Sequence, residues 1–217
     1  MNLLDLLQDD NDQESGRIEG VAVGIVTNNK DEEGMGRIKV SYPWREGSQE
    51  SYWARIANLA AGAQRGSFWL PEVGDEVLLA FDKGDIHHPY ILGALWNGQD
   101  RPPDTNADGE NNTKLIRSRS GHQITMFDKT GEERLEIKTR GGHKILLDDK
   151  AGSARVEIKD SSGINKLVIE TAQNTLTIES GLNLKIKSQS IDIEAGASMS
   201  IKASGTLTLR GSLVQIN

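Results

Sequence analysis

The sequence contains no cysteine and few aromatic residues, and both shortages exclude classes of protein. Without cysteine among its 217 residues, the chain has neither a disulfide framework nor a thiolate zinc site. Phe, Trp and Tyr make up 5% of the residues, and the hydrophobic share of 36% is below that of an ordinary globular domain. A single compact monomer would have too little apolar material for a deep core. The composition therefore favours a long, thin molecule or one that buries surface against partner chains.

Long hydrophobic runs and familiar catalytic motifs are also missing. No segment approaches the roughly 20 apolar residues that span a bilayer. Residues 1–16 carry Asp5, Asp9, Asp10 and Asp12 instead of a basic leader, so we expect synthesis in the cytoplasm without a signal peptide. The sequence has no GxSxG elbow, no P-loop lysine motif and no HExxH pair. These absences remove the usual hydrolase, nucleotide-binding and metalloprotease classes.

Basic residues are scarce in the first half of the chain. Residues 1–113 hold 9 Lys or Arg and 20 Asp or Glu, whereas residues 114–217 hold 16 and 12. An acidic surface argues against a nucleic-acid partner, because that binding needs concentrated positive charge. The change of sign near residue 113 predicts a chain of two parts.

Residues 17–97 are typical of a small closed β-barrel. Short segments rich in β-branched and alternating residues are separated by turn-forming residues, with no strong helical period. Residues 98–113 are nearly devoid of apolar side chains and predict a linker, and residues 1–16 predict a leader that is disordered or docks on another protein such as a hub. The expected strands are residues 18–26, 36–42, 52–56, 76–81 and 90–96.

Residues 114–217 have a short, regular period that predicts a needle. Glycines recur about every 10 or 11 residues up to Gly163, with short alternating segments between them. From Leu176 on, pairs of apolar residues follow one another at steps of 8, 7, 8, 8 and 7 residues. One strand and one corner per unit is typical of a β-solenoid. The pairs are Leu176/Ile178, Leu184/Ile186, Ile191/Ile193, Met199/Ile201, Leu207/Leu209 and Val214/Ile216.

Units of about eight residues are too short for a β-helix made by one chain. Such a helix needs three faces per coil, which takes roughly 18–25 residues between equivalent levels. Three chains that wind together, each supplying a face in turn, close a prism with the aliphatic side chains inside. The period therefore predicts an all-β fold that ends in a trimeric, intertwined, triple-stranded β-helix needle over residues 114–217.

The sequence resembles the spike proteins of contractile injection systems. Residues 17–97 are similar to the OB-fold domain of phage baseplate assembly protein V and of VgrG spikes, and residues 116–135 look like the start of the VgrG needle. The resemblance covers about residues 17–217 and keeps the order of the motifs. The segments that carry it in the first half are residues 36–40, 52–56, 66–78, 84–93 and 96–98.

The resemblance implies a structural protein at the centre of a baseplate, beneath the inner tube, in a phage tail, a type VI-like system or an extracellular injection particle. On sheath contraction the trimer would be driven through the target envelope, in transient contact with its membrane. A related phage spike carries a lysozyme domain where this chain has only residues 98–113. Full-length VgrG carries a hub region ahead of the OB domain, so we expect a separate hub protein. No histidine follows His143, so we expect a separate PAAR-like tip protein rather than a metal-bound apex.

Histidines and paired carboxylates are the first candidates for chemistry. His87 and His88 are neighbours beside Pro89, and we interpret them as loop residues because adjacent side chains point different ways. His122 and His143 both follow glycine and lie two repeats apart. In a trimer the three copies of each could form a ring near the axis that holds an anion or a metal, but the simpler interpretation is that both are ordinary corner or surface residues. The neighbouring carboxylates face opposite sides of a strand and do not flank one scissile bond. These carboxylates are Glu132, Glu133, Asp148 and Asp149.

Four tryptophans, Trp44, Trp53, Trp69 and Trp96, offer a stacking surface for sugar or single-stranded nucleic acid, or serve either core or intersubunit packing. We favour packing, and we interpret the glycines of residues 20–24 and 34–36 as strand and turn glycines rather than a phosphate cradle. The sequence therefore predicts no catalytic residue, no cofactor and no metal. Two alternatives stay open: a tail-associated enzyme that degrades glycans on a β-solenoid, and an OB-type binding module with a trimerising stalk.

Overall fold

The computed structural model describes residues 17–47 and 49–216, so the predicted leader, residues 1–16, lies outside the described residues. The chain divides into two compact units, one up to Gly109 and one from Glu110. The regular secondary structure of the described residues consists of β-strands and two short 3-10 helices, η1 (Asp82–Gly84) and η2 (Thr171–Gln173). The all-β fold class predicted from the sequence is confirmed. None of the described helices has the length and apolar character to cross a membrane.

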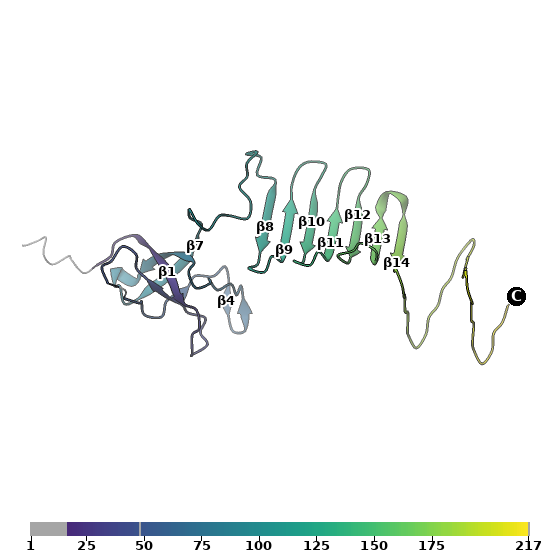
Figure 1. The fold of residues 1–217 in the computed structure, drawn as a ribbon, viewed down its shortest axis with the longest axis horizontal. Helices are drawn as coiled ribbons and strands as arrows, with labels where there is room; N and C mark the ends of the chain where they lie inside the picture. Colours follow the sequence, from purple (N-terminus) through teal and green to yellow (C-terminus); the bar gives the residue numbers. More distant parts are fainter. Residues whose placement is uncertain (1–16, 48, 217) are drawn as a thin grey trace, which may run out of the picture. The chain divides into compact units, whose positions relative to one another are not determined.

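A five-stranded sheet in the order β2-β1-β6-β7-β3 forms the first unit (Figure 1). The pairs β1–β2, β1–β6 and β6–β7 are antiparallel, and the short pair β3–β7 is parallel. A separate hairpin, β4–β5, was not expected from the sequence. The strands are β1 (Val21–Asn28), β2 (Lys39–Ser41), β3 (Arg55–Ile56), β4 (Ala61–Gly62), β5 (Arg65–Gly66), β6 (Glu76–Phe81) and β7 (Pro89–Leu95).

Two backbone hydrogen bonds close this sheet into a barrel. The N–H of Ile38 donates to the carbonyl of Ala54 at 3.1 Å, and the N–H of Ala54 donates to the carbonyl of Ile38 at 2.8 Å. These bonds join the start of β2 to the start of β3, the two outer strands of the sheet order. A closed ring of strands leaves no long edge free to pair with another chain. The small closed barrel expected from the alternation of residues 17–97 is therefore the fold that forms.

The barrel interior is filled by alternate residues of the long strands. β6 shows a strict alternation, in which Val77, Leu79 and Phe81 are buried while their neighbours are half-buried. Gly24 of β1 faces this interior, because a Cβ there would lie 2.8 Å from the Cδ1 of Leu79. A larger residue at this position would force Leu79 and Val40 to shift within the core. The core consists of Val26, Ile38, Val40, Tyr42, Ala54, Val77, Leu79, Phe81 and Ile91.

The loop between β1 and β2 is organised by the carboxylate of Asp31. Its oxygens accept bonds from Nε and Nη2 of Arg37 at 2.7 and 2.8 Å, and from the backbone N–H groups of Glu33, Met35 and Arg37. The bond with the Arg37 side chain is the largest cause that holds the pKa of Asp31 well below its usual value. This one side chain therefore fixes both ends of the turn.

Replacing Asp31 by Asn is expected to lower the unfolding temperature of the barrel and to flatten its dependence on acid pH. The folded pKa lies below the unfolded value near 3.8, so the bonds stabilise the fold at neutral pH and are lost as the pH falls through the folded pKa. Thermal unfolding between about pH 2 and pH 6 measures this. Glu32→Gln is the matched control, because it removes one charge from an exposed position in the same loop. Equal acid sensitivity in wild type and Asp31→Asn would contradict the assignment.

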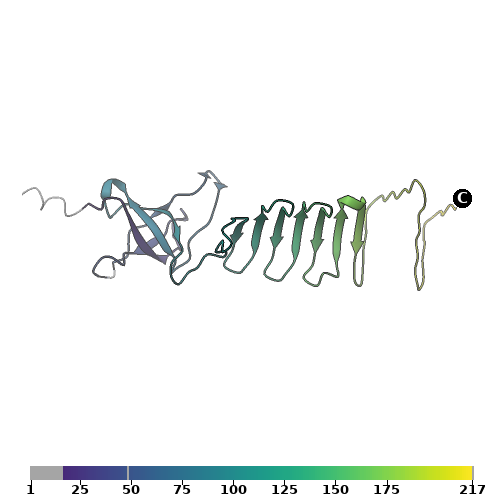
Figure 2. The same ribbon diagram turned by 90° about the horizontal axis from the view of Figure 1, so that it is seen from above.

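A seven-stranded antiparallel sheet occupies the second unit, with the strands side by side in chain order, as Figures 1 and 2 show. Each strand pairs with its neighbour over all five residues without a break in register. The strands are β8 (Thr113–Arg117), β9 (Gln123–Phe127), β10 (Arg134–Lys138), β11 (Lys144–Asp148), β12 (Arg155–Lys159), β13 (Lys166–Glu170) and β14 (Thr175–Glu179).

Glycine turns reverse the chain between these strands. In the β8–β9 turn the N–H of Gly121 donates to the carbonyl of Ser118, and the N–H of Ser118 donates to the carbonyl of His122. Gly121 has φ +93°, which favours glycine, and Gly142 occupies the same place in the β10–β11 turn with φ +93°. These are three-residue hairpin loops with glycine in the left-handed position. The glycine period of 10 or 11 residues thus marks hairpins and not solenoid corners.

The period predicted that the chain winds from one face of a prism to the next. Residues 113–179 do not do so. All their strand pairs form within one chain. Residues 180–216 differ, because they run extended (Figure 1) and none of these described residues pairs with a strand of the same chain. The expected winding around partner chains is thus restricted to the part with the period of about eight residues. Its existence there stays a prediction.

Candidate interaction surfaces

One face of the β8–β14 sheet is almost entirely apolar. Residues two apart on each strand point to the same side, and the cross-strand pairs align them into two continuous rows. Lys114, at the start of one row, is the only charged member. We call the thirteen apolar positions the apolar face: Ile116, Ile124, Met126, Leu135, Ile137, Ile145, Leu147, Val156, Ile158, Leu167, Ile169, Leu176 and Ile178.

The apolar face is uncovered in the single chain. Ten of its residues keep between 38% and 62% of their surface exposed, which is far more than a residue of a packed core retains. Isolated exposed aliphatic residues are normal on a protein, but a contiguous patch over seven strands is not. An apolar patch of this extent is typical of an interaction surface.

The opposite face of the same sheet is mostly polar and has ion pairs of its own, although Leu115, Phe127, Leu146 and Val168 also lie on it and Leu146 is buried. Glu157 is buried and bonds with Lys159 at 2.9 Å, and Glu136 lies 3.3 Å from Lys144. Burial alone would raise the pKa of Glu157, but the neighbouring Lys159, Lys144 and Arg155 outweigh it and lower the pKa. Charged side chains that are paired with one another can remain in contact with water on this face. The sheet is thus amphipathic, because one side is almost entirely apolar and the other is mostly polar and charged.

The extended segment, residues 180–216, has the same character. Its aliphatic residues are exposed throughout, from Leu182 to Ile216. Backbone N–H and C=O groups need partners when they are buried, so burial of these apolar side chains requires strands from elsewhere to supply hydrogen bonds. The segment is therefore incomplete as a single chain.

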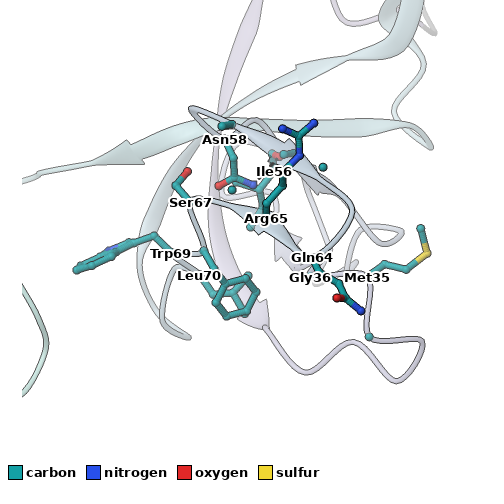
Figure 3. A pocket seen from close by; sticks show the side chains of 15 residues that line it. Met35, Gly36, Ile56, Asn58, Gln64, Arg65, Ser67, Trp69 and Leu70 are labelled. Carbon is teal, nitrogen blue, oxygen red and sulfur yellow. Dashed lines mark hydrogen bonds between the residues drawn. The ribbon is translucent and has the colours of Figure 1, made fainter.

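The first unit has a recess of about 490 Å³ beneath the β4–β5 hairpin. Figure 3 shows Trp69 and Met35 at opposite sides of it, with the side chains of Asn58, Gln64 and Arg65 between. No described residue that lines the recess is a carboxylate or a histidine, so it lacks a general acid or base. Exposed Phe68 and Trp69 make it a better site for packing than for reaction.

His87 and His88 lie in an exposed turn, as expected, but their side chains do not point different ways as we predicted. Nδ1 of His87 lies 2.8 Å from one oxygen of Asp85, and Nδ1 of His88 lies 3.0 Å from the other oxygen. The backbone N–H of His87 also donates to Asp85 and is the largest cause that lowers the pKa of Asp85 to about 2. The turn geometry, which the sequence does not reveal, brings both rings to one carboxylate.

His122 and His143 end equivalent turns on one edge of the second sheet. Each donates its backbone N–H to the hydroxyl four residues before it, Ser118 or Thr139, at 3.1 Å. Nδ1 of His122 also accepts a bond from the N–H of Arg140 at 3.4 Å. Both histidines are exposed corner residues in the chain itself.

The paired carboxylates lie at the other edge of the sheet, Asp148 at the end of β11 and the other three in turns. Glu132 bonds with Lys129 at 3.0 Å, and Asp148 lies 3.8 Å from Arg155. Glu133 and Asp149 belong to neighbouring turns, and the N–H of Asp149 donates to the carbonyl of Glu133 at 2.9 Å. Within residues 17–47 and 49–216 there is no group of three His, Asp or Glu side chains that could hold a metal ion.

None of the four tryptophans belongs to the buried core, so the core-packing prediction for them was wrong. Trp44, Trp69 and Trp96 are exposed, and Trp53 is half-buried under the cations of Arg37 and Lys39. Nε1 of Trp44 donates to the carbonyl of Val23 at 2.9 Å. The core consists of seven aliphatic residues with Tyr42 and Phe81, and contains no tryptophan. Intersubunit packing of the tryptophans stays a prediction.

Comparison with known proteins identifies the first unit. Residues 22–96 match the family described as type VI secretion system/phage-baseplate injector OB domain. The matched span begins in β1 and ends just after β7, which are the first and last strands of the barrel. These residues are an injector OB domain. The chain thus carries the OB domain of the VgrG-like baseplate family, as the resemblance of its motifs implied.

Spike proteins are among the curated relatives of the chain. It is 32% identical over 136 residues to the type VI secretion system spike protein VgrG1c of Pseudomonas aeruginosa, covering 55% of this chain and 19% of that protein. It is 30% identical over 133 residues to the spike protein VgrG3 of Vibrio cholerae, covering 55% and 13%. A third relative, the actin cross-linking toxin VgrG1 of Vibrio cholerae, is 32% identical over 110 residues, covering 46% and 10%. The chain thus spans only a small part of these relatives, and the similarity extends beyond the OB domain.

Proposed function

We propose that this chain is the structural central spike of a contractile injection machine, assembled as a homotrimer. It would sit in the baseplate under the inner tube and be driven through the target envelope on sheath contraction. The apolar face of β8–β14 is the observation that carries this proposal. The injector OB domain and the relatives named as spike proteins support it.

Three copies account for the apolar face better than two. Two amphipathic sheets stacked face to face would cover each other, but two segments 180–216 paired as a ribbon would still leave one backbone edge of each without a partner. Three sheets around one axis enclose the face in a prism, and three extended segments can then wind together below it, each supplying backbone bonds to the next. A shaft of this kind is stiff, because closed pairing and an aliphatic axis resist bending.

The proposed role is mechanical and not enzymatic. The recess beneath β4–β5 lacks acid and histidine, and among the paired carboxylates of the second sheet Glu132 and Asp148 have basic neighbours. Glycan hydrolysis needs two carboxyl groups that face each other across a groove. The relative named as an actin cross-linking toxin shows that its family can carry further activities, and such an activity is not part of this proposal.

Other proteins would complete the machine. We propose a separate hub protein and inner-tube proteins at the OB domain, where Phe68, Trp69 and the recess offer an apolar contact. A PAAR-like tip protein would cover the apolar residues Leu213, Val214 and Ile216, which are exposed in the chain. The chain would be made in the cytoplasm and incorporated into a baseplate.

The purified chain is expected to be a trimer with a mass three times its 23.7 kDa, and to appear in negative-stain electron micrographs as a rod attached to a wider head. Light scattering coupled to size exclusion gives the mass independently of shape. A monomer, or a compact particle without a rod, would refute the spike. Depolymerisation of envelope glycans by the pure trimer would favour the enzyme instead.

A further inference from the structure

The hairpin turns of the β8–β14 sheet lie along two sides of it, at opposite ends of the strands. These two sides, which we call its long edges, differ in charge. The edge formed by the turns 118–122, 139–143 and 160–165 and the strand ends beside them is mainly basic, and we call it the basic edge. The edge formed by the turns 128–133, 149–154 and 171–174 carries more acids than bases, and we call it the acidic edge. On the basic edge, Lys138, Lys144, Lys159 and Lys166 stand in consecutive cross-strand positions.

Like charges on adjacent strands destabilise a sheet unless something neutralises them. Within the chain, Lys144 lies 3.3 Å from Glu136, Lys159 lies 2.9 Å from Glu157, and Lys166 lies 2.9 Å from Glu179. Arg117, Lys138 and Arg140 have no ion pair with any described residue of their own chain. Part of the positive charge on this edge is therefore left without an acid.

Unpaired acids stand on the opposite edge. Glu132 and Asp148 have basic neighbours, but the side chains of Glu133 and Asp149 form no ion pair within the described residues. These two acids belong to the turns on either side of the β10–β11 pair, one before β10 and one after β11. Arg140 lies in the turn that joins β10 to β11 at the other edge. Along the stacking direction, Arg140 is thus at a level between Glu133 and Asp149.

Rotation about a threefold axis brings unlike edges together. A cyclic trimer is made of identical head-to-tail contacts, so each copy presents one edge to its clockwise neighbour and the other edge to its anticlockwise neighbour. With the apolar face inward, the basic edge of every copy lies against the acidic edge of the next. The level of Arg140 then matches that of Glu133 and Asp149 without a shift along the axis.

We infer that Arg117, Lys138 and Arg140 of one copy pair with Glu133 and Asp149 of the next copy at each corner of the trimer. The inference rests on the proposed trimer and adds what orients it. Apolar faces attract one another without fixing direction or register. Exposed ion pairs contribute little individually but exclude wrong arrangements through like-charge contact. The corner pairs therefore select parallel copies in the correct register.

Disulfide trapping tests the contact directly, because the chain has no cysteine of its own. The full-length Arg140→Cys/Asp149→Cys variant is expected to form covalent trimers on mild oxidation, seen on non-reducing gels. The two positions lie on opposite edges of one sheet, separated by a strand of five residues or about 17 Å, so they cannot bridge within a chain. Arg140→Cys alone and Asp149→Cys alone are the controls and should give at most covalent dimers.

Charge reversal tests the role of the pairs. The measured quantity is the chain concentration at which half of the trimer has dissociated, at a fixed concentration of urea. Lys138→Glu/Arg140→Glu and Glu133→Lys/Asp149→Lys are each expected to raise this concentration about tenfold or more. The variant that combines all four substitutions should return it to near the wild-type value. Sedimentation velocity measures this. Lys30→Glu/Lys83→Glu, which makes the same charge change in the first unit, should have no effect.

The outcomes separate the two proposals. A wild-type chain that is not trimeric overturns the proposed function. A trimeric wild type that yields no covalent trimer, or whose single-edge reversals have no effect or are not rescued by the combination, overturns the corner pairs and leaves the spike in place.

Discussion

Replacing Ile137 by Asp is expected to abolish the trimer and to leave monomers or aggregates in its place. Ile137 lies near the middle of the apolar face, between Ile124 and Ile145 on the adjacent strands. In a threefold assembly the substitution places three carboxylates close to one apolar axis. Each must be desolvated or protonated at a cost of several kcal/mol, so trimer stability should fall on the order of a thousandfold or more. Light scattering at several chain concentrations measures the loss.

Two matched variants show whether the effect comes from the interface. Ile137→Leu keeps the volume and the apolar surface, and it should remain a trimer with a small loss of stability. Thr125→Lys places a charge on the other face of the adjacent strand, directly across from Glu136, where an opposite charge can pair with it, and should also remain trimeric. If Ile137→Asp stays trimeric, or if Thr125→Lys dissociates as well, the apolar face is not the trimer interface.

Alternation predicted the β-strands of both units because it records which side of a strand meets water. In β6 the pattern EVLLAF places Val77, Leu79 and Phe81 inside the barrel, and in β10 the pattern RLEIK places Leu135 and Ile137 on the apolar face. The barrel could be predicted because its core comes from its own residues. Its closure through Ile38 and Ala54 could not, because a two-residue bridge leaves no pattern in the sequence.

The connections between strands were harder to predict than the strands themselves. A glycine every 10 or 11 residues fits a solenoid corner and a hairpin loop equally well. The two differ in backbone direction, which depends on whether the glycine has a positive φ, as Gly121 and Gly142 have. A serine or threonine three residues before each of these glycines, Ser118 or Thr139, is the signal that could have indicated hairpins.

The sequence predicted that apolar surface would stay exposed, but not where the candidate surfaces lie. Low aromatic content and short aliphatic pairs indicated that the chain cannot bury its own apolar residues, and the apolar face contains many of these exposed residues. The charge difference between the two edges of the sheet was not visible, because Arg140 and Lys138 are separated from Lys159 and Lys166 in sequence. Hairpin register brings them to one edge.

Replacing Leu79 by Ala is expected to destabilise the OB domain by about 2–5 kcal/mol without dissociating the second unit. Leu79 is fully buried and its Cδ1 lies against Gly24, so the cavity left by the substitution cannot be filled by a side chain from β1. Because the two units have separate contacts, thermal unfolding followed by calorimetry should show the barrel transition at a lower temperature and the second transition unchanged. Leu59→Ala is the matched control: Leu59 is 99% exposed, and the same truncation there should change stability by less than about 0.5 kcal/mol. A single transition that shifts as a whole in Leu79→Ala would mean that the OB domain and the second unit unfold as one cooperative body.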